Sequence, residues 1–185
     1  MKNLLPINGR IAIVDNEINE ALPLMRTFSK NQIPYTFFKG DDLKYLPNDP
    51  LNDIRILFLD LNLLNNRTAS EKEVRGMLYS VLSKIISPIN YPYCLIYWSK
   101  QEKEYTKALE GLFENELKEL TPIRVIPFIK SDFFPNFGAE EQQTEKDIIQ
   151  ELDLILQSMP SYSYLLSWEN QIHKASDHTL KDIFG

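Results

Sequence analysis

Five short apolar runs recur along the chain, and amphipathic segments follow most of them. The runs are rich in β-branched and aromatic residues and cover residues 10–15, 33–40, 54–60, 93–99 and 123–130. Apolar residues recur at helical spacing in four further segments, 19–31, 69–87, 103–117 and 144–159. Strands that alternate with helices pair in parallel through right-handed crossovers. The pattern therefore predicts a doubly wound α/β fold with a mostly parallel sheet.

Composition excludes several classes of protein. At 185 residues, with 43% hydrophobic and 25% charged residues, the chain suits one globular domain with an appendage. Cys94 is the sole cysteine, so an internal disulfide is excluded and a reducing, cytoplasmic setting is favoured. With two histidines, it forms no zinc-binding spacing. No apolar run has the length of a membrane span, the start does not resemble a signal peptide, and a net charge of -6 disfavours nucleic-acid binding.

Polar residues stand at the ends of four of the five predicted strands. They are Asp15, Asn16 and Glu17 after the first run, Asp60 and Asn62 after the third, Ser99 after the fourth and Lys130 after the fifth. Ligand sites in open parallel sheets form beyond the carboxyl ends of the strands. We therefore expect acids, a hydroxyl and an ammonium group to converge on one cleft.

With these motifs in view, the chain resembles the response-regulator receiver domain of two-component signalling. Over about residues 9–158, "IAIVDNE" is similar to the acidic strand of that family and "LFLDLNL" to its phosphoacceptor strand. "LIYWS" is similar to the strand that carries the family's hydroxyl, and "PFIK" to the strand that carries its lysine. The resemblance implies a flavodoxin-like (βα)5 sheet with strand order 2-1-3-4-5. Longer spacings between the motifs indicate a lengthened third helix and an enlarged fourth crossover in a divergent member.

The resemblance also implies a role for each strand-end residue. Asp60 would be the nucleophile that takes the phosphoryl group, Ser99 would hydrogen-bond that group, and Lys130 would pair with it. Mg²⁺ would be held by the positions Asp15, Asn16, Asp60 and Asn62, the last through a nearby backbone carbonyl. The implied partners are a histidine kinase or another phosphodonor and a downstream effector. No enzymatic activity is expected beyond the protein's own phosphorylation and dephosphorylation.

Departures from the family's pattern keep a second interpretation open. Asn16 stands where the family has a second acid, which should weaken Mg²⁺ binding, and Glu17 beside it points away unless the loop turns it inward. Lys100 follows Ser99 where a small residue is usual, and Pro127, which fits an edge strand, stands where the family has an aromatic switch residue. A second interpretation is a pseudo-receiver, an interaction module that keeps the fold without phosphoryl chemistry. It is favoured by Asn16, by Lys100 and by the longer spacings between the motifs.

Two further alternatives concern individual residues. A haloacid-dehalogenase-like phosphatase also begins with a strand-end aspartate, but it would have an acid at the position of Asn62. Ser99 could instead cap a helix in a capping box with Glu102, and Lys130 could be a solvated strand-end residue.

The C-terminal segment lies beyond the predicted receiver-like domain, which covers residues 1–159. Residues 160–185 read as one more helix or linker, leading to a downstream effector or serving as a dimerising or self-packing appendage. If exposed, the aromatic and apolar side chains at its start would form a protein-contact patch: Tyr162, Tyr164, Leu165 and Trp168.

Overall fold

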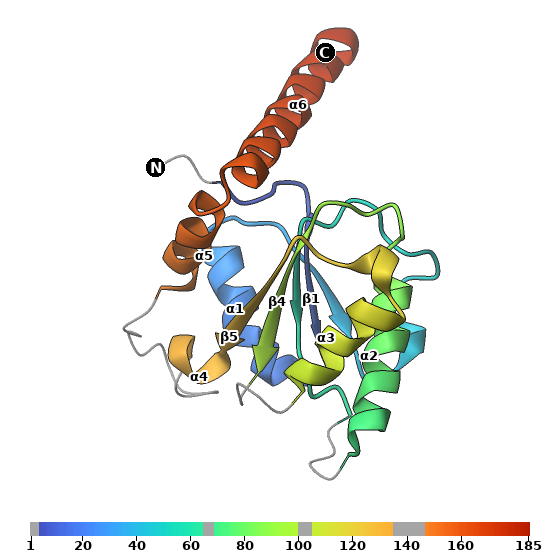
Figure 1. Cartoon of the computed structure of the whole chain (residues 1–185). Helices are drawn as coiled ribbons and strands as arrows, with labels where there is room; N and C mark the ends of the chain where they lie inside the picture. The colour runs from blue at the N-terminus through green and yellow to red at the C-terminus, as the bar shows by residue number, and fades with distance from the viewer. Residues whose placement is uncertain (1–3, 65–68, 100–104, 135–146) are drawn as a thin grey trace.

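The computed structural model describes residues 4–64, 69–99, 105–134 and 147–185 (Figure 1). Its described strands form one parallel sheet in the order β2-β1-β3-β4-β5. They are β1 (Ile11–Asp15), β2 (Thr36–Lys39), β3 (Ile56–Leu59), β4 (Cys94–Ser99) and β5 (Arg124–Ile129). The flavodoxin-like α/β fold predicted from the sequence is therefore confirmed, including its strand order.

Helices cover both faces of the sheet (Figure 1). The described helices are α1 (Ile18–Lys30), α2 (Glu71–Ile85), α3 (Thr106–Asn115), the short α4 (Lys130–Phe133), α5 (Ile148–Gln157) and α6 (Pro160–Phe184). Buried side chains of α2 and α3 pack on one face of the sheet, and those of α1 and α5 pack on the other.

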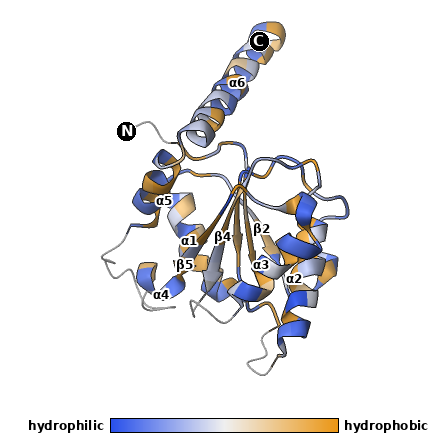
Figure 2. Cartoon of the chain, viewed as in Figure 1, coloured by the Kyte–Doolittle hydropathy of each residue, from blue (hydrophilic) through white to orange (hydrophobic). Residues whose placement is uncertain are grey.

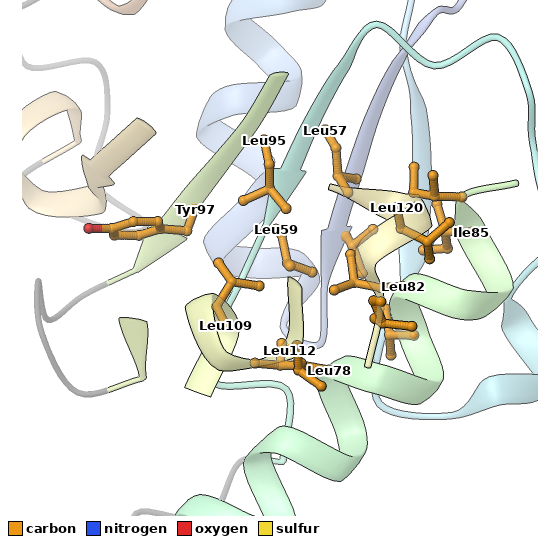
Figure 3. Packing of buried hydrophobic residues seen from close by; sticks show 14 of the residues in the cluster. Leu57, Leu59, Leu78, Leu82, Ile85, Leu95, Tyr97, Leu109, Leu112 and Leu120 are labelled. Carbon is orange, nitrogen blue, oxygen red and sulfur yellow. The ribbon is translucent and has the colours of Figure 1, made fainter. Parts of the chain in front are cut away.

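The central strand β3 shows why the sheet is buried on both sides. Ile56 and Phe58 contribute to the core beside α1 and α5, whereas Leu57 and Leu59 contribute to the core beside α2 and α3. Successive side chains of a strand point to opposite faces, so a strand between two helix layers is apolar throughout. Figure 3 shows the second of these cores, in which leucines of β3 and β4 meet leucines of α2 and α3.

The connection between β2 and β3 contains the 3-10 turn η1 (Leu43–Tyr45) and no α-helix. Pro47 and Pro50 lie in this connection. Proline has no backbone N–H and clashes with the preceding helical turn, so the segment cannot continue as a helix. The resemblance implied a helix after every strand, and the second crossover differs from that expectation.

The predicted C-terminal helix is present as α6, and its two halves differ. Tyr162 and Leu166 are buried in the core beside α5, and Asn170 bonds the N-terminal segment: its Nδ2 donates to Leu5 O (3.0 Å) and its Oδ1 accepts from Ile7 N (3.1 Å). From Gln171 the helix projects from the body, and its side chains are exposed apart from the half-buried His173 (Figures 1 and 2).

The predicted contact patch at the start of α6 is wrong in part. Tyr162 is buried and its hydroxyl donates to Arg55 O, while Leu165 is half-buried. Only Tyr164 and Trp168 of the four side chains are exposed. No described helix combines the length and the apolar character that a membrane span requires.

Candidate functional site

Three of the predicted residues meet at the carboxyl end of the sheet. Asp15 is the last residue of β1, Asp60 follows β3, and Lys130 follows β5. Lys130 Nζ donates to Asp15 Oδ2 at 2.7 Å and to Asp60 Oδ2 at 3.2 Å. Lys130 was expected to end the fifth strand, but β5 ends at Ile129. Lys130 instead begins α4, whose turn is closed by a bond from Phe134 N to Lys130 O (2.9 Å).

Backbone hydrogen bonds fix both aspartates. Asp60 N donates to Val14 O (2.9 Å), which continues the ladder between β3 and β1 and holds Asp60 beside Asp15. The second carboxylate oxygen of each aspartate accepts a backbone N–H two residues on: Asp15 Oδ1 from Glu17 N (2.9 Å) and Asp60 Oδ1 from Asn62 N (3.1 Å). Aspartate commonly makes this local turn, which leaves the other oxygen directed at Lys130.

A third carboxylate, Glu20, completes the cluster and was not predicted. Its Oε2 accepts from Lys130 Nζ at 3.0 Å. Glu20 lies in the first turn of α1, where an acid is favoured by the helix dipole whatever its role. The helix dipole alone explains an acid at this position, so the sequence carries no signal that Glu20 belongs to the site. Glu20 reaches the site because α1 begins at Ile18. We call Asp15, Glu20, Asp60 and Lys130 the carboxylate cluster.

The carboxylate cluster carries more acidic than basic groups, and its ionisation reflects that imbalance. Burial, and then the charge of Asp60, raises the pKa of Asp15 to about 7. Burial also raises the pKa of Asp60. For Lys130, burial acts to lower the pKa, but the charges of Asp60 and Asp15 outweigh it and the pKa is raised. A proton or a further cation is therefore favoured among these carboxylates.

The cluster has the chemistry of a divalent-cation site. One carboxylate oxygen from each of Asp15, Glu20 and Asp60 lies within 4.8 Å of the others. Carboxylate oxygens are the ligands that Mg²⁺ prefers. Asn16 is 3% exposed, and its Nδ2 has no hydrogen-bond partner among the described residues. Asn62 is half-buried and contributes its backbone N–H to Asp60. The side chains present thus fit a hard cation.

Two other residues singled out in the sequence, Ser99 and Pro127, lie on the neighbouring strands β4 and β5. Ser99 ends β4 and pairs in register with Ile129, the residue before Lys130. The Ser99 side chain lies outside the described part of the chain, as do Lys100 and Glu102. Pro127 is exposed on the edge strand β5, as its sequence position predicted. The neighbouring Phe128 is buried and stacks on Phe133 of α4, with ring centroids 4.8 Å apart.

Comparisons with known proteins add little to this geometry. No family model matches the chain. No curated protein matches it either. Among solved structures, the signal receiver domain of a LuxO repressor protein from Vibrio parahaemolyticus is similar, at 11% identity over 91% of this chain and 97% of that chain, with a TM-score of 0.39. A similarity this low carries no information about chemistry. The flavodoxin-like fold is shown by the strand order and the parallel pairing of the sheet itself.

Proposed function

We propose that this protein is a receiver module of a signalling pathway, in which Asp60 accepts a phosphoryl group from a histidine kinase or another phosphodonor. The observation that carries the proposal is the Lys130 ammonium group bonded to both Asp15 and Asp60 where three parallel strands end. An in-line transfer to a carboxylate needs a positioned nucleophile and cations beside it. Asp60 supplies the nucleophile, and Lys130 supplies one of the positive charges.

The transfer itself forms a bond between an Asp60 carboxylate oxygen and phosphorus. With a phosphohistidine donor, the bond from phosphorus to the imidazole nitrogen breaks, and the imidazole leaves with the electron pair. Lys130 turns from the carboxylate to the phosphoryl oxygens, and Asp60 becomes an acyl phosphate. A divalent cation held by the acidic side chains would neutralise charge on the phosphoryl oxygens.

The consequence of the transfer is a changed protein interface. Residues 1–159 would act as the receiver-like domain and residues 160–185 as its connection to a downstream effector or to a second copy. Ser99 would report the modification by bonding a phosphoryl oxygen, as the resemblance implies. A cytoplasmic location agrees with this role.

A pseudo-receiver is the second candidate, and the burial of Asp60 favours it. Its side chain is 6% exposed, and both of its oxygens already accept hydrogen bonds, from Lys130 Nζ and from Asn62 N. Asn16 supplies no charge where the family has an acid. In this case the fold serves to hold an interaction surface, and no phosphoryl group is transferred.

Trp98 offers a direct test of the two candidates. Its side chain is fully buried and stacks on Phe133 at a centroid distance of 6.5 Å, so it senses the helical turn that Lys130 begins. Trp168 is the other tryptophan of the chain, and Trp168→Phe leaves Trp98 as the sole fluorophore of its kind. We would titrate Mg²⁺ into this variant, with and without beryllofluoride, which mimics a phosphoryl group on aspartate.

A saturable change that requires Mg²⁺ and beryllofluoride together, and that is lost in Asp60→Asn, is the result expected. Asp49→Asn removes the same charge from an exposed residue outside the carboxylate cluster and should respond like the parent. A flat response from a protein that circular dichroism shows to be folded would favour the pseudo-receiver instead.

A further inference from the structure

We propose that Glu20 is a ligand of the divalent cation in this site and replaces the acid that is missing at Asn16. This inference rests on the cation site of the proposed function. The observation behind it is geometric: Glu20 presents a carboxylate oxygen within 4.8 Å of oxygens of both Asp15 and Asp60. Its Oε2 also shares Lys130 Nζ with them, at 3.0 Å.

The first turn of α1 brings Glu20 to the cluster, and Glu17 is not among the described carboxylates that lie within 4.8 Å of one another there. Glu17 is the N-cap of α1 and has extended backbone angles (φ -110°, ψ 98°), and its N–H is already bonded to Asp15 Oδ1. Glu20 N donates to Glu17 O at 2.9 Å, which closes the turn. Helical side chains lean toward the N-terminus of their helix, so the Glu20 carboxylate is directed back to the end of β1.

Glu20 supplies the negative charge that the site lacks because position 16 is an asparagine. An acid pair at the end of the first strand would give three carboxylates with Asp60, but Asn16 leaves two. Glu20 restores the third. In the described structure one ammonium group, that of Lys130, bonds all three carboxylates. A divalent cation brings twice that charge to the same oxygens and competes with Lys130 for them.

The exposure of the four side chains in the carboxylate cluster indicates which of them a cation from solution would reach first. The side chains of Asp15 and Lys130 are 0% exposed and that of Asp60 is 6% exposed, but that of Glu20 is 20% exposed. An entering cation therefore meets Glu20 first. A cation held by Glu20 would replace one of the three bonds of Lys130 Nζ and would leave its bonds to Asp15 and Asp60 in place.

Four variants of the full chain test this assignment by titration calorimetry with Mn²⁺, which binds oxygen ligands as Mg²⁺ does. Glu20→Gln keeps the size of the side chain and a hydrogen-bond acceptor for Lys130, but it should lower the affinity by about tenfold or more. Glu17→Gln removes the same charge three residues earlier and is the matched control, with an affinity close to that of the parent. Asn16→Asp should raise the affinity.

The fourth variant tests replacement directly, because Asn16→Asp combined with Glu20→Gln should recover most of the affinity that Glu20→Gln loses. Equal weakening in Glu17→Gln and Glu20→Gln would overturn the assignment and leave only a general charge effect. If the parent binds Mn²⁺ and responds to beryllofluoride while Glu20→Gln binds like the parent, only the role of Glu20 fails. If the parent binds no Mn²⁺ at all, the cation site of the proposed function fails with it.

Discussion

Two groups of buried and half-buried charges lie at opposite ends of the same two strands. The carboxylate cluster lies where β1 and β3 end. The other group, which we call the arginine cluster, lies where they begin and consists of Arg10, Arg55 and Glu169. Arg10 directly precedes β1 and Arg55 directly precedes β3, while Glu169 comes from α6. The two clusters have reversed compositions, because three acids face one lysine at one end and two arginines face one glutamate at the other.

The arginine cluster is held by several directed bonds. Arg55 donates through Nε and Nη2 to the two oxygens of Glu169, at 3.0 and 2.8 Å, and Arg10 donates to the same carboxylate. Both arginines also donate to backbone carbonyls, Arg55 to Pro92 O (3.3 Å) and Arg10 to Asp53 O (3.3 Å). Paired bonds between a guanidinium group and a carboxylate are among the strongest in proteins.

The pKa shifts of the two clusters therefore have opposite directions. Burial acts to raise the pKa of Glu169, but bonds from Arg55 and Arg10 outweigh it and hold the pKa below its usual value. In the carboxylate cluster one lysine does not outweigh burial, and the pKa values of Asp15 and Asp60 are raised. The arginine cluster fixes α6 to the body as it stands, whereas the carboxylate cluster is stabilised by any cation or proton that it gains.

The largest effect should follow from removing the one cation of the carboxylate cluster. Lys130→Met leaves buried carboxylates without their partner, and such a loss typically costs about 3–5 kcal/mol. We expect a decrease of that size in the free energy of unfolding at pH 8, measured by urea denaturation, and a smaller decrease at pH 5, where the acids can take up protons. A decrease below about 1 kcal/mol at pH 8 would mean that Lys130 does not balance these acids.

An acid-to-amide change should have different consequences in the two clusters. Glu169→Gln removes the charge that the buried Arg10 and the half-buried Arg55 share, and we expect a loss of roughly 2–3 kcal/mol. Asp60→Asn removes one of three crowded acids, so at pH 8 the free energy of unfolding should be unchanged or higher. Urea denaturation of both variants beside the parent measures the contrast. Losses of similar size in both would contradict the reversed charge balance.

The pH dependence of stability should separate the clusters as well. The pKa of Asp15 rises from 3.8 in the unfolded chain to about 7 in the folded protein. Between these values the folded state binds more protons, so stability falls as the pH rises. Asp15→Asn removes this dependence, and its stability relative to the parent should increase by roughly 2–4 kcal/mol from pH 4 to pH 8.

Glu169 contributes in the opposite sense. Its folded pKa lies below the unfolded value of 4.5, so its stabilisation is present above that pH and is lost as the pH falls through the folded value. Glu169→Gln should therefore differ most from the parent near neutral pH and least in acid. A difference from the parent that does not change with pH in either variant would show that the carboxyl concerned titrates alike in the folded and unfolded chain.

Most of the fold was predictable from the sequence. Strands and helices follow from the spacing of apolar residues, and strands that alternate with helices pair in parallel. Parallel strands bring their carboxyl ends to one edge, so the order of elements alone predicts that Asp15, Asp60 and Lys130 lie near one another. Their roles in phosphoryl transfer stay predictions. The order of strands followed from the resemblance, and the strand pairing confirms it.

The parts that the sequence did not predict depend on exact positions and on distant contacts. Glu20 enters the site because α1 begins at Ile18, and helix starts are uncertain by a residue or two from sequence. Glu169 lies 114 positions from Arg55, and nothing local in either segment indicates their pairing. The sequence left open whether the last helix packs on its own body, and the bond from the Tyr162 hydroxyl to Arg55 O shows that its first half does.

The smallest effect should come from the part of α6 that neither cluster touches. The arginine cluster and Asn170 fix α6 as far as residue 170. Apart from the half-buried His173, the side chains beyond are exposed, including those of Ile172, Ile183 and Phe184. Ending the chain after Gln171 should therefore change the free energy of unfolding of the body by less than about 0.5 kcal/mol. Ending it after Met159 removes Glu169 and the buried Tyr162 and Leu166 as well, and should cost several times more.

Urea denaturation of the two shortened chains, beside the parent, measures this difference. If ending the chain after Gln171 already destabilises the body by more than about 1 kcal/mol, the projecting half of α6 packs on protein in solution. That protein is either its own body or a second copy of the chain. An unfolding midpoint that depends on protein concentration would identify the second copy.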